Sequence, residues 1–179
     1  MSLKKVLLTG GNGFIAAHII PRLLSHNYNV VTTVRSEPKT NYLRKKFASA
    51  VGSGQLKFAI VPDIVVEGAF DDVLKNEQPE VVLHTSSPYV FNITDVTKDL
   101  LEPAILGTTG ILKSIKAHGP TVKRVVITSS FASMIDRSKG NRPGYVYSEK
   151  DWNPTTFEES QKDPASGYYG SKTLAEKAA

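Results

Sequence analysis

Two short segments of the sequence carry side chains that together could polarise and protonate a carbonyl oxygen. Tyr168 and Lys172 are four residues apart, so on a helix they share one face and lie about 6 Å apart along its axis. A free phenol, with a pKa of about 10, is a poor acid–base catalyst at neutral pH, but a nearby ammonium stabilises the phenolate. Ser129 and Ser130 follow a predicted strand, where a hydroxyl can hydrogen-bond the reacting oxygen.

A glycine-rich turn near the start of the sequence could hold the phosphates of a dinucleotide. It reads Gly10-x-x-Gly13-x-x-Ala16 and leads directly into an amphipathic helix that we expect from about Gly13 to His26. Gly10 permits a tight turn, Gly13 lets the backbone approach a pyrophosphate, and Ala16 keeps the helix close to the sheet. The helix N-terminus adds free N–H groups. Tyr-x-x-x-Lys alone occurs by chance in many proteins, but with this turn and the serine pair it becomes specific.

The helix after the turn is expected to bury one broad face. Its apolar stripe comprises Phe14, Ile15, Ile19, Ile20 and Leu23. Pro21 lies inside the same stretch and lacks the N–H of its turn, so we expect a kink or a tightened end there.

The end of the second predicted strand indicates which dinucleotide the turn would bind. NAD-specific sites usually carry an acidic residue there to hold the ribose 2′-hydroxyl. Here Arg35 stands at that place, and a guanidinium can bind a 2′-phosphate through paired hydrogen bonds, with Lys39 as a second cation. Alternatively, both are solvated charges at a strand end, and Glu37 could still select NAD. The balance favours NADP (NADPH).

Two more strand ends lie on the expected path of the cofactor. Asp63 could accept a hydrogen bond from the adenine amine, although a turn-forming Asp after Pro is a close alternative. Thr85 and Ser86 would lie near the ribose and phosphates, whereas we expect His84 to be packed rather than catalytic. The predicted cofactor-binding residues are Gly10, Gly13, Phe14, Ile15, Arg35, Lys39, Asp63, Ile64, Thr85, Ser86, Tyr168 and Lys172.

Five β-branched runs must position these side chains. They cover residues 5–9, 29–34, 56–61, 81–85 and 124–128, with four segments long enough for helical crossovers between them. Each run is almost continuously apolar, as in parallel strands that are covered on both faces. The alternation predicts an α/β fold, a doubly wound parallel sheet of the Rossmann type, in one domain over residues 1–179.

Three later segments give more local signals. Residues 95–118 are expected to be helical, with a bend or restart at Pro103 and a stop at His118-Gly119-Pro120. Residues 136–166 are rich in Pro, Gly, Ser and charge, which predicts a long loop of the kind that often contacts substrate. Residues 173–179 are good helix formers.

The composition excludes several classes of protein. The 179 residues are 40% hydrophobic and contain no Cys, which excludes a disulfide framework, a thiolate metal site and Cys catalysis; no metal site is predicted. The apolar run 6–8 is too short for a signal peptide or a membrane span, so we expect a soluble, cytoplasmic protein. Lys and Arg are scattered, so the net charge of +5 favours an anionic cofactor over nucleic acid.

Several segments together resemble one family. They are Thr9-Gly10-Gly11-Asn12-Gly13-Phe14-Ile15-Ala16, Val61-Pro62-Asp63, Leu83-His84-Thr85-Ser86-Ser87-Pro88, Thr128-Ser129-Ser130, Trp152-Asn153-Pro154 and residues 168–179. On these residues the chain resembles an extended short-chain dehydrogenase/reductase of the dihydroflavonol-reductase-like branch. Fungal NADPH-dependent methylglyoxal and aldehyde or ketone reductases belong to that branch, and the likeness spans essentially the whole chain.

The resemblance implies hydride transfer from NADPH to a small aldehyde or ketone. Tyr168 would donate the proton, and Lys172 would hold the nicotinamide ribose and tune Tyr168. Ser130 would polarise the carbonyl, with Ser129 as the alternative. Phe131 and the residues after it would face the substrate.

The chain also departs from the pattern of this family. Many relatives place an Asn in the fourth helix where this chain has Leu106, which argues against a proton relay there. Sugar dehydratases of the superfamily carry Asp-Glu after the fifth strand, whereas this chain has Ser-Ser-Phe. Members of the branch continue with a sixth strand and a substrate-binding region, so we expect an N-terminal portion in which that C-terminal region is absent. A sugar-nucleotide epimerase or dehydratase and a non-catalytic NADP-binding module stay open as alternatives.

Overall fold

The computed structural model describes residues 4–87 and 92–179. The strands are β1 (Lys5–Leu8), β2 (Asn29–Val34), β3 (Leu56–Ile60), β4 (Val81–His84) and β5 (Arg124–Ile127). The α-helices are α1 (Phe14–Ser25), α2 (Asn41–Lys46), α3 (Ala48–Gly52), α4 (Asp71–Glu77), α5 (Glu102–His118), α6 (Phe157–Ser160) and α7 (Pro164–Lys177). Shorter helical turns are η1 (Glu37–Thr40), the π-helical turn η2 (Thr97–Leu101), η3 (Phe131–Ser133) and η4 (Arg137–Lys139).

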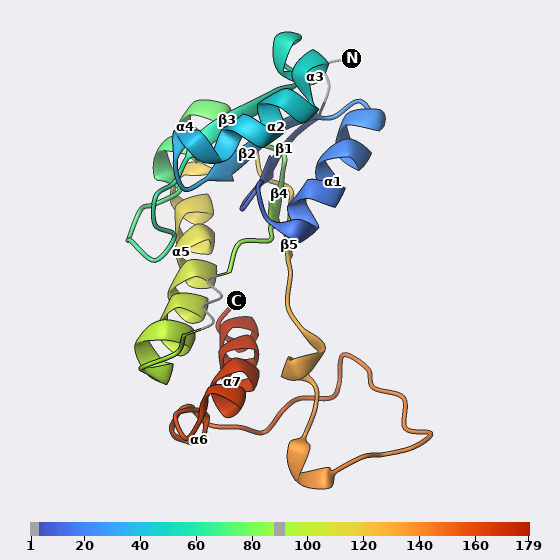
Figure 1. Ribbon diagram of the computed structural model, residues 1–179, viewed down its shortest axis with the longest axis vertical. Helices are drawn as coiled ribbons and strands as arrows, with labels where there is room; N and C mark the ends of the chain where they lie inside the picture. The colour runs from blue at the N-terminus through green and yellow to red at the C-terminus, as the bar shows by residue number, and fades with distance from the viewer. Residues whose placement is uncertain (1–3, 88–91) are drawn as a thin grey trace. The chain divides into compact units, whose positions relative to one another are not determined.

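The five strands form one parallel sheet in the order β3-β2-β1-β4-β5 (Figure 1). β1 pairs with β2 on one side and with β4 on the other. The direction in which strands are added reverses between β1 and β4, and such sheets bind ligands at the carboxyl ends of the strands beside the reversal. The predicted Rossmann fold is confirmed, and each predicted strand agrees with the observed one to within one residue.

Contacts within the chain define two compact units, which are described separately. Unit 1 comprises Met1–Ser86 and Gly110–Thr128, and it contains the whole sheet. Unit 2 comprises Ser87–Thr109 and Ser129–Ala179, and it contains α6 and α7. The prediction of one domain over residues 1–179 stays a prediction.

Unit 1 has two hydrophobic clusters, one on each face of the sheet. Successive residues of a strand point to opposite faces, so Leu7 belongs to the cluster that includes Ile111 of α5, and Leu8 to the cluster that includes Ile20 of α1. Both Leu side chains are fully buried. Because helices cover both faces, the central strands are almost continuously apolar in sequence, and polar residues within them, such as Thr32, are buried as well.

The first turn of α1 differs from the prediction. The later part of the expected stripe packs into the core, at Ile19, Ile20 and Leu23. The helix continues through Pro21. Phe14 and Ile15, however, are 83% and 47% exposed, so the prediction that they join the buried face was wrong. They precede Ala16, the first buried residue of the helix, and so lie where α1 has not yet reached the apolar surface of the sheet.

In unit 2, α7 packs closely against α6 and η2 at two glycines. A Cβ atom on Gly170 would lie 1.9 Å from Oγ of Ser160, and one on Gly167 would lie 2.3 Å from Cγ1 of Val96. A residue with a side chain does not fit at either contact. These contacts therefore set the position of α7 along and about its own axis.

The start of α7 lies inside the segment that was predicted to be a loop. Asp163 caps this helix by accepting a hydrogen bond from the N–H of Ser166 at 2.9 Å, and Pro164 occupies the first turn. Most of the predicted loop is confirmed, since α6 and η4 are the only other helical turns described between residues 136 and 166. The restart predicted at Pro103 is confirmed by the change from η2 to α5 at Glu102, and α5 ends at His118 as expected. In the described part of the chain, no helix is long and apolar enough to span a bilayer.

Candidate active site

The three predicted catalytic side chains lie in unit 2, and two of them meet. The hydroxyl of Tyr168 is 3.4 Å from Oγ of Ser130, although 38 residues separate them. Lys172 follows one turn later on α7, with its ammonium 6.0 Å from the centre of the Tyr168 ring and 3.4 Å from Oγ of Ser87. The two hydrogen bonds are longer than usual O–H···O and N–H···O contacts, as is common at catalytic groups before substrate binds.

The two adjacent serines have different hydrogen-bond partners. Ser129 donates its hydroxyl hydrogen to Oε2 of Glu176. Oγ of Ser130 accepts from the N–H of Ala132 at 3.2 Å and from the hydroxyl of Tyr168. A hydroxyl has one hydrogen and two lone pairs. Among the described residues, the hydrogen of Ser130 therefore has no acceptor, whereas the hydrogen of Ser129 is already bound to a carboxylate.

The glycine turn lies in unit 1, and two of its positions, Gly10 and Gly11, favour a residue without a side chain. Gly10 has a φ of +72°, which confirms the tight turn. A Cβ atom on Gly11 would lie 2.2 Å from Oγ1 of Thr32 on β2, so no side chain fits there. Gly13 is the N-cap of α1, and no side chain of the described residues caps this helix with a hydrogen bond. Ala16 is 1% exposed and packs in the core, as predicted. The turn thus presents an open helix N-terminus, with Gly13 at its start, that suits a phosphate.

The buried hydroxyl of Thr9 connects the glycine turn to the end of β4 through hydrogen bonds. Oγ1 of Thr9 accepts hydrogen bonds from the N–H groups of Thr85 and Ser86 at 3.0 and 3.1 Å. It also lies 2.9 Å from Oγ of Ser86 and 3.0 Å from Nδ1 of His84. Thr85 and Ser86 are therefore held at the glycine turn, on the predicted cofactor path. His84 is 2% exposed and hydrogen-bonded, in agreement with a packed rather than catalytic residue.

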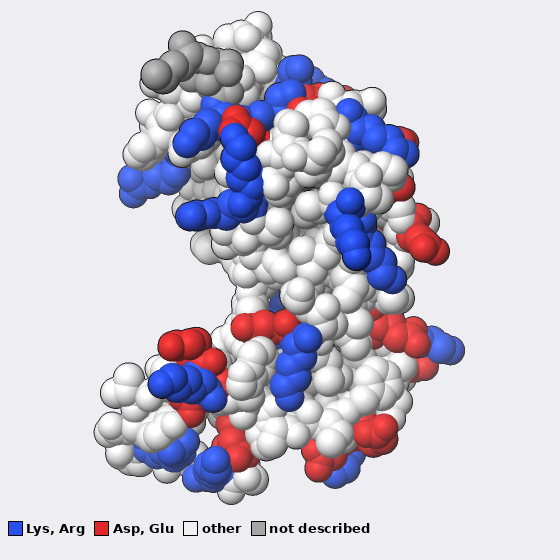
Figure 2. Space-filling view, turned by 180° about the vertical axis from the view of Figure 1, so that it is seen from behind, with Lys and Arg blue, Asp and Glu red and all other residues white. Residues whose placement is uncertain are grey.

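The charges at the end of β2 favour a cofactor ribose that carries a 2′-phosphate over one that carries a 2′-hydroxyl. Arg35 and Lys39 are both exposed. Glu37 forms an ion pair with Arg44 at 2.8 Å, so its carboxylate is already engaged. The basic excess of the whole chain lies in unit 1, where Figure 2 shows groups of Lys and Arg on one face, whereas unit 2 carries mixed charges.

The remaining predicted contacts differ in how accessible they are. Asp63 is exposed, and its Oδ1 accepts a hydrogen bond from the N–H of Val65 at 3.0 Å, as in a local turn. Ile64 is buried in the core of unit 1, so only its backbone could reach a cofactor. The exposed side chains of Phe14 and Ile15, by contrast, are accessible at the start of α1. Pro88, part of one of the family segments, lies outside the described residues.

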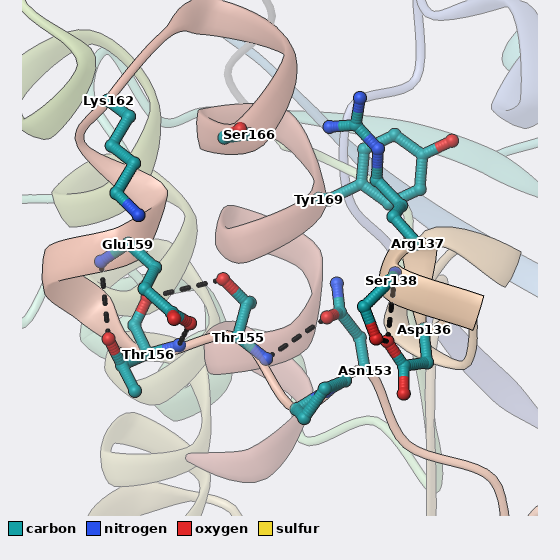
Figure 3. A pocket seen from close by; sticks show the side chains of 11 residues that line it. Asp136, Arg137, Ser138, Asn153, Thr155, Thr156, Glu159, Lys162, Ser166 and Tyr169 are labelled. Carbon is teal, nitrogen blue, oxygen red and sulfur yellow. Dashed lines mark hydrogen bonds between the residues drawn. The ribbon is translucent and has the colours of Figure 1, made fainter. Parts of the chain in front are cut away.

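A polar cavity of about 630 Å³ lies beside α7 (Figure 3). Its walls come from η4, the segment around Asn153, α6 and α7, and the guanidinium of Arg137 stacks 5.0 Å from the centre of the Tyr169 ring. Tyr169 lines this cavity, but Ser130, Tyr168 and Lys172 do not. This cavity is therefore separate from the Ser–Tyr–Lys group.

Four residues at these sites were not among the predicted ones: Thr9, Gly11, Ser87 and Glu176. The second glycine of Gly10-Gly11 was a visible signal, because paired glycines often mark a close approach of two backbones. Thr9, Ser87 and Glu176 lie in the segments that carry the family resemblance, but their partners are at least 47 residues away in sequence, so no local pattern identifies these contacts. Within the described residues, no group of three or more His, Asp or Glu side chains could hold a metal ion.

A doubly wound sheet with this glycine turn, together with a Ser–Tyr–Lys group after β5, defines a dinucleotide-binding domain of the extended short-chain dehydrogenase/reductase class. Residues 6–179 match the NAD dependent epimerase/dehydratase family, and the chain belongs to this family. The resemblance expected from the sequence is thereby confirmed.

Several relatives with assigned names are fungal reductases. The chain is 46% identical over 177 residues to a putative NADPH-dependent methylglyoxal reductase of Candida albicans, covering 97% of this chain and 52% of that protein. It is 44% identical to the NADPH-dependent methylglyoxal reductase of Saccharomyces cerevisiae, covering 97% and 51%. The crystal structure of Gre2 from Candida albicans in complex with NADPH is similar with a TM-score of 0.92 at 42% identity, covering 98% of this chain and 51% of that one. The chain thus spans about half the length of these relatives.

Proposed function

We propose that the protein reduces the carbonyl group of a small aldehyde or ketone with NADPH. The observation that carries this proposal is the approach of the Tyr168 hydroxyl to Oγ of Ser130, with Lys172 one turn further along α7. NADPH, when bound, supplies the hydride. The chain itself must then orient the carbonyl, stabilise the charge that develops on its oxygen and deliver a proton to that oxygen.

Ser130 and Tyr168 divide the work at the carbonyl oxygen. Ser130 donates its hydrogen to this oxygen, which stabilises the negative charge as it develops. The carbonyl oxygen replaces Oγ of Ser130 as the acceptor of the Tyr168 hydrogen, and Tyr168 transfers its phenolic proton to it. Lys172 stabilises the resulting phenolate by its positive charge and also holds the nicotinamide ribose. Ser129 is the less suitable serine, because its hydrogen is bound to Glu176.

The cofactor site is built from unit 1. Gly10 and Gly13 at the start of α1 would hold the pyrophosphate, and Thr85 and Ser86 the adjoining ribose and phosphates. Arg35 would bind the 2′-phosphate with support from Lys39, since Glu37 is already paired with Arg44. Two of the relatives are named as NADPH-dependent reductases, which supports the choice of NADPH.

Replacing Tyr168 by Phe in the protein at its full natural length tests this function. We expect turnover of methylglyoxal and a panel of simple aldehydes and ketones to fall about 10²- to 10⁴-fold, the usual contribution of a positioned proton donor. NADPH binding should be retained. The matched control is Tyr169→Phe, which removes a neighbouring phenol that lines the separate polar cavity, and its turnover should stay near that of the wild type.

Three results would contradict the proposal. Unchanged turnover in Tyr168→Phe would remove the tyrosine from the chemistry. Cofactor binding without turnover of any carbonyl would favour a non-catalytic NADP-binding module. An NAD molecule that copurifies and stays bound through the reaction would favour a sugar-nucleotide epimerase.

A further inference from the structure

Glu176 binds the serine next to the proposed catalytic serine. Its Oε2 atom accepts the hydroxyl hydrogen of Ser129, 47 residues earlier in the chain. Both residues belong to unit 2. A hydrogen bond to a carboxylate is about twice as strong as one between neutral groups. Ser129 can donate to another acceptor only by giving up this bond.

Glu176 shares a helix face with the proposed catalytic side chains. Tyr168, Lys172 and Glu176 follow one another at intervals of four residues on α7. Glu176 therefore lies about 12 Å along the helix axis from Tyr168. The segment after β5 is joined to this face at two consecutive residues, Ser129 to Glu176 and Ser130 to Tyr168.

The backbone between these two contacts explains how consecutive residues reach different parts of α7. Ser130 is extended, with φ of −148° and ψ of 150°. Side chains of successive extended residues point in opposite directions. A bond that fixes Ser129 therefore also fixes the direction in which Ser130 points.

The geometry points to Glu176 as a positioning residue of the proposed reduction. Its carboxylate fixes Ser129 and thereby orients the neighbouring Ser130 toward Tyr168. This role rests on the proposed function, since it concerns the orientation of the group that would bind the carbonyl. Glu176 itself touches neither substrate nor cofactor in this role.

Three single variants and one double variant separate the acceptor role of Glu176 from its charge. Glu176→Ala removes the acceptor, and we expect kcat to fall about tenfold while KM for the carbonyl and the affinity for NADPH stay within about twofold. Glu176→Gln keeps an acceptor oxygen but no charge, so it should restore kcat to within about threefold of the wild type. Ser129→Ala should match Glu176→Ala, and the double variant should be no slower than either single one, because both changes remove the same contact.

The measurements are steady-state kinetics on the full-length protein, together with its thermal midpoint. Glu149→Ala is the matched control, since it removes an exposed carboxylate of unit 2 and should leave kcat unchanged. A purely structural role would lower the thermal midpoint of Glu176→Ala and leave kcat as in the wild type.

The inference and the proposed function fail in different ways. Wild-type kcat in Glu176→Ala, or a Gln variant as slow as the Ala variant, overturns the positioning role through Ser129. Additive losses in the double variant overturn it as well. In each case, a large loss of turnover in Tyr168→Phe still supports the carbonyl reductase. If Tyr168→Phe turns over normally, the proposed function itself fails.

Discussion

Oγ of Ser130 accepts hydrogen bonds from the N–H of Ala132 at 3.2 Å and from the hydroxyl of Tyr168 at 3.4 Å. Both of its lone pairs are thus used, and its one hydrogen, which has no acceptor among the described residues, is left for the carbonyl oxygen of the proposed reaction. We expect Ser130→Ala to lower kcat about 10²- to 10³-fold, as the loss of one donor to a developing oxyanion usually does. The check is carbonyl-dependent NADPH oxidation by the full-length protein. Ser129→Ala is the internal control, and a larger loss for this variant than for Ser130→Ala would reverse the assignment of the two serines.

Arg35 is expected to decide between the two nicotinamide cofactors. Arg35→Asp removes paired, charge-assisted hydrogen bonds to a 2′-phosphate and adds a repelling charge, so NADPH affinity should fall about 100-fold or more. NADH affinity should change by less than about threefold, because NADH has no phosphate at that position. Titration calorimetry with both cofactors measures the two constants.

Glu37 offers a second test of the same site. Its carboxylate is paired with Arg44, so Glu37→Gln should leave the affinity for NADH nearly unchanged. A large loss of NADH binding in this variant would instead assign the ribose hydroxyls to Glu37. Equal losses of NADH and NADPH in Arg35→Asp would refute the 2′-phosphate role of Arg35.

Gly11 is the position in the glycine turn where a methyl group does not fit. Its Cβ atom would lie 2.2 Å from Oγ1 of Thr32, a buried hydroxyl that donates to the carbonyl of Leu8. Overpacking of this kind costs about 1–3 kcal/mol, so Gly11→Ala should lower the free energy of unfolding by that amount. Gly52→Ala is the control: nothing lies within 4 Å of its Cβ position, and this variant should be neutral or slightly stabilising. Urea unfolding compares the two, and equal stability would contradict the predicted contact.

Asp71 links α4 to the end of α5 in a pH-dependent way. A hydrogen bond from Ser114 and the charge that His118 carries when protonated, with its Nε2 3.2 Å away, hold the pKa of Asp71 below its usual value. A lowered pKa in the folded state stabilises the protein above the unfolded pKa of about 3.9, and this stabilisation is lost as the pH falls through the folded value.

Replacing Asp71 by Asn measures this contribution. Because the pair is partly exposed, we expect a loss of about 1 kcal/mol at neutral pH. The difference from the wild type should shrink as the pH is lowered below about 4. Asp72→Asn removes the neighbouring, exposed carboxylate of the same helix turn and controls for the helix dipole. A difference that stays constant down to strongly acidic pH would refute the assigned cause.

The sheet could be predicted from the sequence because burial on both faces makes each central strand an apolar run. The same signal failed at Phe14 and Ile15, which have the spacing of a buried stripe but are exposed. Periodicity shows which residues share a face of a helix, not where along the helix the contact with the sheet begins. The start of α7 was missed although Asp163 and Pro164 form a good cap, because Pro, Gly and charge dominate the residues before it.

The Ser–Tyr–Lys group could be predicted because the four-residue spacing of Tyr168 and Lys172 places them on one face of a helix. Thr9 and Glu176 have no such spacing to their partners. Thr9 gains its role only when β1 and β4 come together, and Glu176 only when α7 meets the segment after β5. Contacts of this kind depend on tertiary packing, which one sequence does not reveal.

The two glycine contacts of α7 have a consequence for how the proposed active site would respond to solution conditions. Steric repulsion at Gly167 and Gly170 sets the placement of the helix that carries Tyr168, and such repulsion depends neither on proton concentration nor on ionic strength. These two contacts themselves would then be unchanged by acid, base or salt, whereas the Asp163 cap and the Glu176–Ser129 bond of the same helix depend on carboxylates.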